Sequence, residues 1–180
     1  APVTKIFVGT NDGALRLIDA ETGQEEWIVY IPEFLPKQAT LMDNPQGTHI
    51  AGPNVGLDGT PSVYVIDNNN NGVIEPSDND KVYLYIGQRR GGRDIYAFDV
   101  TPDTVLSTPG TIGQIRPKFM WRIRGGSGNF ARLGQTWSRP LVAKILIKCQ
   151  SGKCDDGDSA TADSEFKDVL IFAGGYDPAL

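Results

Sequence analysis

The sequence is poor in the residues that most often carry catalysis or bind a soft metal. Its 180 residues include one histidine, His49, and two cysteines, Cys149 and Cys154. The histidine lies in the turn-rich segment NPQGTHIAGPN, and the chain has no G-x-S-x-G sequence that would expose a serine nucleophile. We therefore expect the protein not to be an enzyme.

The chain also lacks a long apolar run, a basic stripe and extended helical periodicity. Its net charge is -5, and the one local cluster of arginines, RRGGR at 89–93, is too short to reverse that balance. We expect no membrane insertion and no nucleic-acid partner. What the chain does have is 21 glycines, 12 prolines and short runs of β-branched and aromatic residues, which favour β structure with many turns.

The two cysteines lie in KCQSGKC, separated by four residues that include a glycine. A hairpin turn could close this spacing into a disulfide, which would indicate the periplasm or the cell exterior. Free thiols are the second interpretation. A zinc half-site is the weakest, because there is no second cysteine pair and His49 is distant in sequence.

Nine short strands follow from the alternation of apolar and polar residues, and the fold class they predict is all-β. Three connections are long enough to be functional or flexible, at 32–60, 101–117 and 149–167. The expected strands are 5–9, 14–19, 27–31, 62–66, 81–87, 95–100, 118–123, 141–148 and 169–174.

An internal repeat decides the architecture. KIFVGTNDGALRLIDAETGQEEW has a strand, a glycine turn, a strand ending in Asp19, a second turn and Trp27. A second copy runs from KVYLYIGQRRGGRDIYAFDV to FMWRI, with Asp99 and Trp121, and a third begins at DVLIFAGG. Such meanders are the repeats of β-propellers. Two units and a fragment cannot close a ring, so we expect residues 1–180 to be an incomplete part of a larger propeller. The alternative is a self-sufficient β-sandwich.

The segment IDNNNNGVIEPSDND at 66–80 carries the pattern of a twelve-residue calcium loop. Counting Asp67 as position 1 places oxygen donors at the ligand offsets and Gly72 at position 6, where the chain must turn sharply. The expected ligands are Asp67, Asn69, Asn71, the Val73 carbonyl, Glu75 and Asp78.

Calcium suits this loop because a hard cation takes six to eight oxygens, and neutral amide oxygens are acceptable donors. Only Asp67, Glu75 and Asp78 bring charge, and Asp at position 12 is shorter than the usual Glu, so modest affinity is expected. Magnesium fits less well because it requires stricter octahedral geometry. The alternative is an asparagine-rich turn whose side chains cap the backbone without any metal.

Several quoted segments together resemble one family. VGTNDGALRLIDAETGQEEW, the run from GLDG through RRGGR to FDV, WSRPLVAKI and VLIFAGGYDPAL occur in the order found in the carboxy-terminal propeller of the PilY/PilC family. These proteins are type IV pilus tip-associated adhesins and biogenesis factors. The resemblance covers nearly the whole chain apart from its loops.

This resemblance implies a modified, quinoprotein-like propeller preceded in the parent protein by a long region that can hold a von Willebrand A-like module. It also implies a calcium site at Asp67, Asn69, Asn71 and Glu75, with asparagine here at two positions where carboxylates are frequent. The implied role is in pilus assembly, extension and retraction control, and surface attachment. The implied partners are minor pilins at the pilus tip and a host or abiotic surface, at a location from the periplasm to the cell surface.

Two other functions fit parts of the pattern. In an extracellular propeller scaffold, calcium would only hold one loop in place and would have no regulatory role. A quinoprotein dehydrogenase shares the DAETG…W pattern, but that family has adjacent cysteines over its cofactor, whereas Cys149 and Cys154 are five positions apart.

We further expect Arg89, Arg90 and Arg93 either to brace their turn against Asp94 and Asp99 or to bind an acidic partner. Three tryptophans, Trp27, Trp121 and Trp137, are expected to pack between strands.

Overall fold

The computed structural model describes residues 3–43, 55–105, 110, 114–148 and 165–177. His49, Cys149 and Cys154 lie outside these residues, so the interpretations that concern them stay predictions. Within the described chain, the strands are antiparallel throughout and are joined by short 3-10 turns and one α-helix. The all-β prediction is confirmed.

The first sheet, sheet A, is a three-stranded meander in the order β1-β2-β3. Its strands are β1 (Lys5–Gly9), β2 (Ala14–Asp19) and β3 (Glu25–Tyr30). A 3-10 turn, η1 (Pro32–Lys37), and the short helix α1 (Gln38–Asp43) follow it. The sequence pattern did not predict these two elements, and Phe34 and Leu41 are the side chains that bury them against the core.

The second sheet, sheet B, has four strands in the order β4-β5-β6-β7. Its strands are β4 (Ser62–Ile66), β5 (Lys81–Gly87), β6 (Ile95–Asp99) and β7 (Lys118–Ile123). Three 3-10 turns lie in connections: η2 (Pro76–Asp78) between β4 and β5, η3 (Arg89–Gly91) between β5 and β6, and η4 (Gly128–Phe130) after β7.

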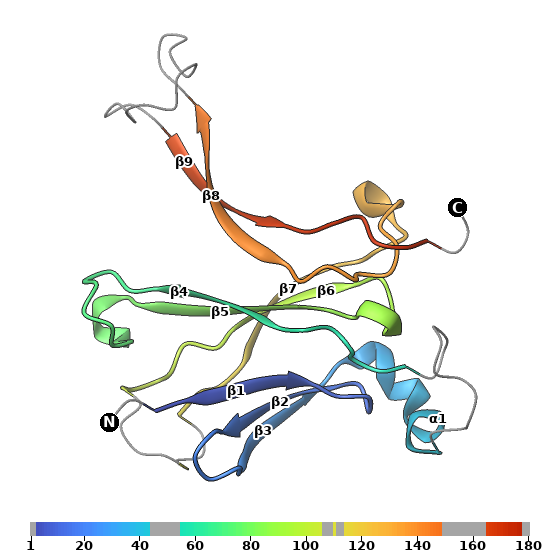
Figure 1. Cartoon of the computed structure of the whole chain (residues 1–180), viewed down its shortest axis with the longest axis horizontal. Coiled ribbons are helices and arrows are strands. Elements are labelled where there is room, and N and C mark those ends of the chain that lie inside the picture. The colour runs from blue at the N-terminus through green and yellow to red at the C-terminus, as the bar shows by residue number, and fades with distance from the viewer. Residues whose placement is uncertain (1–2, 44–54, 106–109, 111–113, 149–164, 178–180) are drawn as a thin grey trace.

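The third sheet, sheet C, is the hairpin of β8 (Leu141–Lys148) and β9 (Glu165–Ile171). Sheet B lies between sheet C and sheet A, so the three sheets stack in chain order like successive blades (Figure 1). Within the described residues no sheet closes on itself. This arrangement agrees with the predicted incomplete propeller.

Most strand boundaries agree with the sequence prediction, and three differ. β3 begins two residues earlier than expected and ends at Tyr30, and β6 ends at Asp99 rather than at 100. The largest difference is β9, which spans Glu165–Ile171 instead of 169–174. Three of its four additional residues, Glu165, Lys167 and Asp168, are charged, and they pair with β8 although the apolar pattern does not mark them as a strand.

The hydrophobic core lies between sheets A and B. It joins side chains of β2 and η1 to side chains of β5 and β6, and Leu57 from the segment before β4 completes it. Leu15, Leu17, Leu84 and Ile86 are all 0% exposed. Sheet C is different, because Leu141 is 57% exposed and Ile171 is 54% exposed. The stability of the described chain therefore comes mainly from the packing of sheet A on sheet B.

The repeated Asp and Trp make corresponding contacts in both units. Asp19 accepts hydrogen bonds from the Thr22 N–H (2.8 Å) and hydroxyl (2.9 Å), and Asp99 accepts them from the Thr101 N–H (2.9 Å) and hydroxyl (2.5 Å). Each aspartate thus ties down the turn that follows its strand. Trp27 packs on the Phe7 ring, and Trp121 packs on Tyr85 with 5.8 Å between ring centroids.

Ion pairs hold several of these elements together. Lys5 Nζ lies 2.9 Å from the fully buried Asp19 carboxylate and also contacts Glu26 Oε1. Asp58, in the GLDG segment, receives two hydrogen bonds from the Arg90 guanidinium, at 2.7 and 3.0 Å. The Gly110 N–H and the Lys5 ammonium lower the pKa of Asp19, and the Arg90 guanidinium lowers that of Asp58.

Acid is expected to destabilise the protein through these carboxylates. A carboxyl whose pKa is lower in the folded state stabilises the fold above its unfolded pKa of about 3.9, and that contribution is lost as the pH falls through the folded value. Asp94 acts in the opposite direction, because burial raises its pKa. Urea unfolding at pH 7, 4 and 3 should show a loss below about pH 4 that is smaller in Asp58→Asn. Equal slopes in both proteins would contradict this assignment.

Candidate metal centre

The predicted calcium loop connects β4 to β5 at one end of sheet B, where it extends beyond the neighbouring strands (Figure 1). Residues 67–75 form a turn without regular structure, and η2 leads from it into β5. Ile66 and Lys81 are paired across the two strands, so both ends of the loop are fixed by the sheet. The loop therefore leaves the sheet at Ile66 and returns to it at Lys81.

Each of the four consecutive asparagines has a separate role. Asn68 Nδ2 donates to the Asp78 and Asn79 carbonyls, at 3.1 and 3.0 Å, and so joins the two ends of the loop. Asn70 has φ +56°, a left-handed backbone conformation that asparagine tolerates better than most residues. The run of asparagines is therefore a specific structure rather than polar filler.

The other two asparagines are two of the predicted ligands, and each makes the same pair of contacts. Asn69 Oδ1 accepts from the Asn71 N–H (3.0 Å) while Asn69 Nδ2 donates to Asp78 Oδ2 (2.5 Å). Asn71 Oδ1 accepts from the Val73 N–H (2.7 Å) while Asn71 Nδ2 donates to Glu75 Oε2 (2.9 Å). The loop thereby brings five of the six predicted ligand residues into one hydrogen-bonded unit.

Asp67, the sixth, anchors the turn and also carries an unsatisfied atom. Its Oδ2 accepts a hydrogen bond from the Gly72 N–H at 2.8 Å, and Gly72 has φ +79° as its position in the pattern requires. Its Oδ1 is buried and has no hydrogen-bond partner. A buried carboxylate oxygen without a partner costs stability unless a water or a cation satisfies it.

A seventh residue, Asp80, supports the loop and was not predicted. It is 0% exposed and accepts hydrogen bonds from the Asn68 and Glu75 N–H groups, both at 2.9 Å. These two donors lower its pKa. Because Asp80 lies two positions beyond the twelve-residue pattern, the offsets could not indicate it. Its role is to hold the two sides of the loop together from beneath.

These contacts permit a test of whether the residues fit a calcium ion. Within the described residues, no three His, Cys, Asp or Glu side chains are gathered in a way that could hold a metal. Asp67, Glu75 and Asp78 therefore do not form a three-carboxylate cluster, and the other predicted donors are amide and main-chain oxygens. The hydrogen bonds of the asparagines would also serve a turn without metal. The free, buried Oδ1 of Asp67 is the feature that a metal-free turn leaves unexplained, and it fits an oxygen-binding cation.

The arginine cluster braces its turn, but through partners other than those predicted. Arg89 and Arg90 contact Asp58, and Arg93 pairs with Asp177 at 2.9 Å. The expected pairing with Asp94 and Asp99 was wrong: Asp94 pairs with Arg122 at 2.6 Å and Asp99 binds its own turn. The true partners are 31 to 84 positions away in sequence, beyond the reach of a local pattern.

Trp137 also departs from expectation, because it does not pack between strands. Its ring is 42% exposed, and the Arg89 guanidinium lies 4.9 Å from the ring centroid. This geometry is a cation–π contact at the surface.

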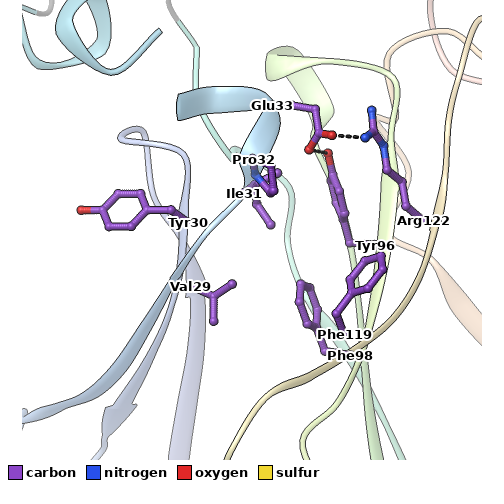
Figure 2. Close-up of a pocket in the computed structure, with 9 residues that line it drawn as sticks. All are labelled: Val29, Tyr30, Ile31, Pro32, Glu33, Tyr96, Phe98, Phe119 and Arg122. Atoms are coloured by element: carbon purple, nitrogen blue, oxygen red, sulfur yellow. Dashed lines mark hydrogen bonds and ion pairs between the residues drawn. The ribbon is translucent and has the colours of Figure 1, made fainter. Parts of the chain in front are cut away.

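An apolar cavity of about 260 Å³ lies between sheets A and B (Figure 2). At one end Glu33 accepts a hydrogen bond from the Tyr96 hydroxyl (2.8 Å) and pairs with Arg122. These polar groups satisfy one another, and the Tyr30 ring points away from the cavity, so the space offers mainly apolar walls. The lining residues are Val29, Tyr30, Ile31, Pro32, Glu33, Tyr96, Phe98, Phe119 and Arg122.

Comparison with known proteins shows a similarity in structure, but no match in sequence to a family model or a curated protein. Among solved structures, the chain is similar to the crystal structure of the Pseudomonas aeruginosa PilY1 C-terminal domain, with a TM-score of 0.47 and 23% sequence identity. The similarity covers 77% of this chain and 22% of that one, so this chain spans about a fifth of the length of the solved chain. None of the helices in the described residues is long and apolar enough to cross a membrane.

Proposed function

We propose that the loop at 67–78 binds one calcium ion, and that the chain is a calcium-binding β-propeller segment of a type IV pilus-associated adhesin or biogenesis protein. The observation that carries the calcium part is the Asp67 Oδ1 atom, which is buried in the loop and has no hydrogen-bond partner among the described residues. The pilus part rests on the sequence motifs shared with the PilY/PilC family.

Six residues would hold the ion: Asp67, Asn69, Asn71, Val73 through its carbonyl, Glu75 and Asp78. Bound calcium would supply positive charge around which these oxygens gather, without redox or acid–base chemistry. Calcium would offset the repulsion that arises when the three carboxylates are drawn together, and Asn69 and Asn71 already orient two of them. By mass action, calcium at a hundred times its dissociation constant should stabilise the folded protein by roughly 2.7 kcal/mol.

That amount is enough to order a surface loop but not to generate force. An effect on pilus extension or retraction therefore needs a partner that senses the ordered loop, and minor pilins at the pilus tip are the partners we propose. In this proposal the protein acts by binding, not as an enzyme. Its proposed location extends from the periplasm to the cell surface. A host or abiotic surface is a further proposed binding target.

Binding to purified minor pilins tests the proposal. Surface plasmon resonance should show binding in calcium that falls in EGTA, and the Asp67→Ala variant should bind as weakly in calcium as the unmodified protein does in EGTA. Asp43→Ala removes an exposed carboxylate of α1 and serves as the matched control. Binding that is unaffected by EGTA and by Asp67→Ala would contradict a calcium-dependent role at the pilus tip.

One observation favours a second candidate, a propeller scaffold with a purely structural calcium. Within the part of the chain that the structure describes, the side-chain hydrogen bonds of the loop stay within residues 67–80, so none of them connects the loop to another sheet. In that case calcium would stabilise the protein and pilin binding would not change. Two measurements, thermal unfolding and pilin binding, each made with and without calcium, separate the two candidates.

A further inference from the structure

A polar cavity lies at the end of sheet B opposite the 67–78 loop. Its volume is about 190 Å³, and it is formed where the segment before β4, the end of β5 and the segment before β8 meet (Figure 1). The lining residues are Gly59, Thr60, Gly87, Arg89, Thr136, Trp137, Ser138 and Arg139. This volume is below the range of about 300–1,000 Å³ typical of sites for drug-sized ligands, so it suits a single small group.

The charge in this cavity is positive and incompletely neutralised. Asp58 is the carboxylate in contact with Arg89, but both of its oxygens are used by Arg90, and its distance to Arg89 Nη1 is longer, at 3.3 Å. Arg139 is exposed and has no ion pair within the described residues. Two arginines thus line the cavity, and Asp58, the carboxylate that contacts Arg89 among the described residues, is mainly engaged by Arg90.

Arg89 is held in place by an unusual backbone. Its φ is +54°, a left-handed conformation that costs a non-glycine residue about 1 kcal/mol or more. Its N–H donates to Thr136 Oγ1 at 3.1 Å, and its guanidinium lies over the Trp137 ring. These contacts hold Arg89, which lines the cavity, in one position.

The floor of the cavity is closely packed backbone rather than open loop. A Cβ on Gly59 would lie 1.8 Å from the Gly87 carbonyl oxygen, so only glycine permits this approach. Next to the floor, the Ser138 hydroxyl accepts from the Ala173 N–H at 2.8 Å, which leaves its hydrogen available to donate. The cavity therefore combines fixed walls with cationic and hydroxyl donors.

We propose that this cavity binds one oxyanion group, a carboxylate or a phosphate, through Arg89, Arg139 and the Ser138 hydroxyl. Guanidinium groups bind such anions through charge-assisted hydrogen bonds, and a planar fork matches the spacing of two anion oxygens. The site is independent of the calcium loop, because the two lie at opposite ends of β4 and β5.

Two anions test this inference: inorganic phosphate and acetate, each titrated at constant ionic strength into protein that has been stripped of calcium and transferred to calcium-free buffer without chelator. The readout is the NMR signal of the Trp137 indole N–H, assigned with Trp137→Phe. Saturable shifts with one or both anions are expected, and the anion that binds more tightly identifies the group the site takes. Arg139→Gln should weaken that binding roughly tenfold, as expected for the loss of a charged hydrogen-bond partner.

Arg132→Gln is the matched control, because Arg132 is also exposed in the segment before β8 but does not line the cavity. It should leave the affinity unchanged. Equal effects of the two substitutions would mean that only general charge screening is involved, and the proposal would fail. It would also fail if neither anion gave a saturable shift. Because the buffer contains no calcium, neither result depends on the proposed calcium site.

Discussion

The Lys5→Met variant is expected to lose about 3 kcal/mol of unfolding free energy. Methionine keeps the apolar stem of the side chain and removes its charge. The Lys5 side chain is 6% exposed and lies between the carboxylates of Asp19 and Glu26, which are 0% and 1% exposed. Removing one partner from a buried ion pair leaves an uncompensated charge, and such changes typically cost about 3–5 kcal/mol. Urea denaturation at pH 7 measures the difference.

Lys81→Met is the matched control for this prediction. Lys81 is the first residue of β5, the strand that corresponds to β1 in the second repeat, and it makes no ion pair within the described residues. Its replacement should change the unfolding free energy by no more than about 0.5 kcal/mol, as is usual for surface positions. If Lys5→Met proved as stable as Lys81→Met, the buried ion pair would not be a main support of sheet A.

The Asp67→Ala variant is expected to bind calcium roughly a hundredfold more weakly than the unmodified protein, a difference of about 2.7 kcal/mol. The substitution removes one of the three charged ligands and the only acceptor seen for the Gly72 N–H, which holds the turn at position 6. Equilibrium dialysis against calcium at pH 7 measures the affinity of each protein.

Two further variants make this result specific. Asp67→Asn keeps the shape and an oxygen but removes the charge, so its affinity should lie between those of Asp67→Ala and the unmodified protein. Asp43→Ala should bind calcium normally, since Asp43 lies in α1, outside the loop. An unchanged affinity in Asp67→Ala would remove the proposed first ligand from the site.

The strands were predictable because their signal is local. Alternating apolar residues mark β1, β2, β4, β5 and β7 with the observed bounds. The pattern fails where a polar residue is buried by a distant partner. Glu26, near the start of β3, is buried because Lys5 lies beside it, and nothing near Glu26 in the sequence indicates this. The helical segment after β3 was missed because two buried side chains, Phe34 and Leu41, are too few to establish a period.

The candidate metal centre was predictable to a similar extent. Fixed offsets within one loop pointed to Asp67, Gly72 and the asparagines, which the structure shows in contact with other residues of the loop, and their role as calcium ligands stays a prediction. Asp80 lies outside those offsets, and its role follows only from the fold that places it beneath Asn68 and Glu75. Arg89 and Arg139 illustrate the same limit, since 50 residues separate two side chains that line one cavity.

The most direct test of the central claim is isothermal titration of calcium into the calcium-free protein. The proposed site predicts saturable heat that fits one ion per chain, a much weaker response to magnesium, and higher thermal stability of the calcium-loaded protein. A titration without heat, together with an unchanged unfolding temperature at millimolar calcium, would contradict the claim and leave residues 67–78 as an asparagine-rich turn.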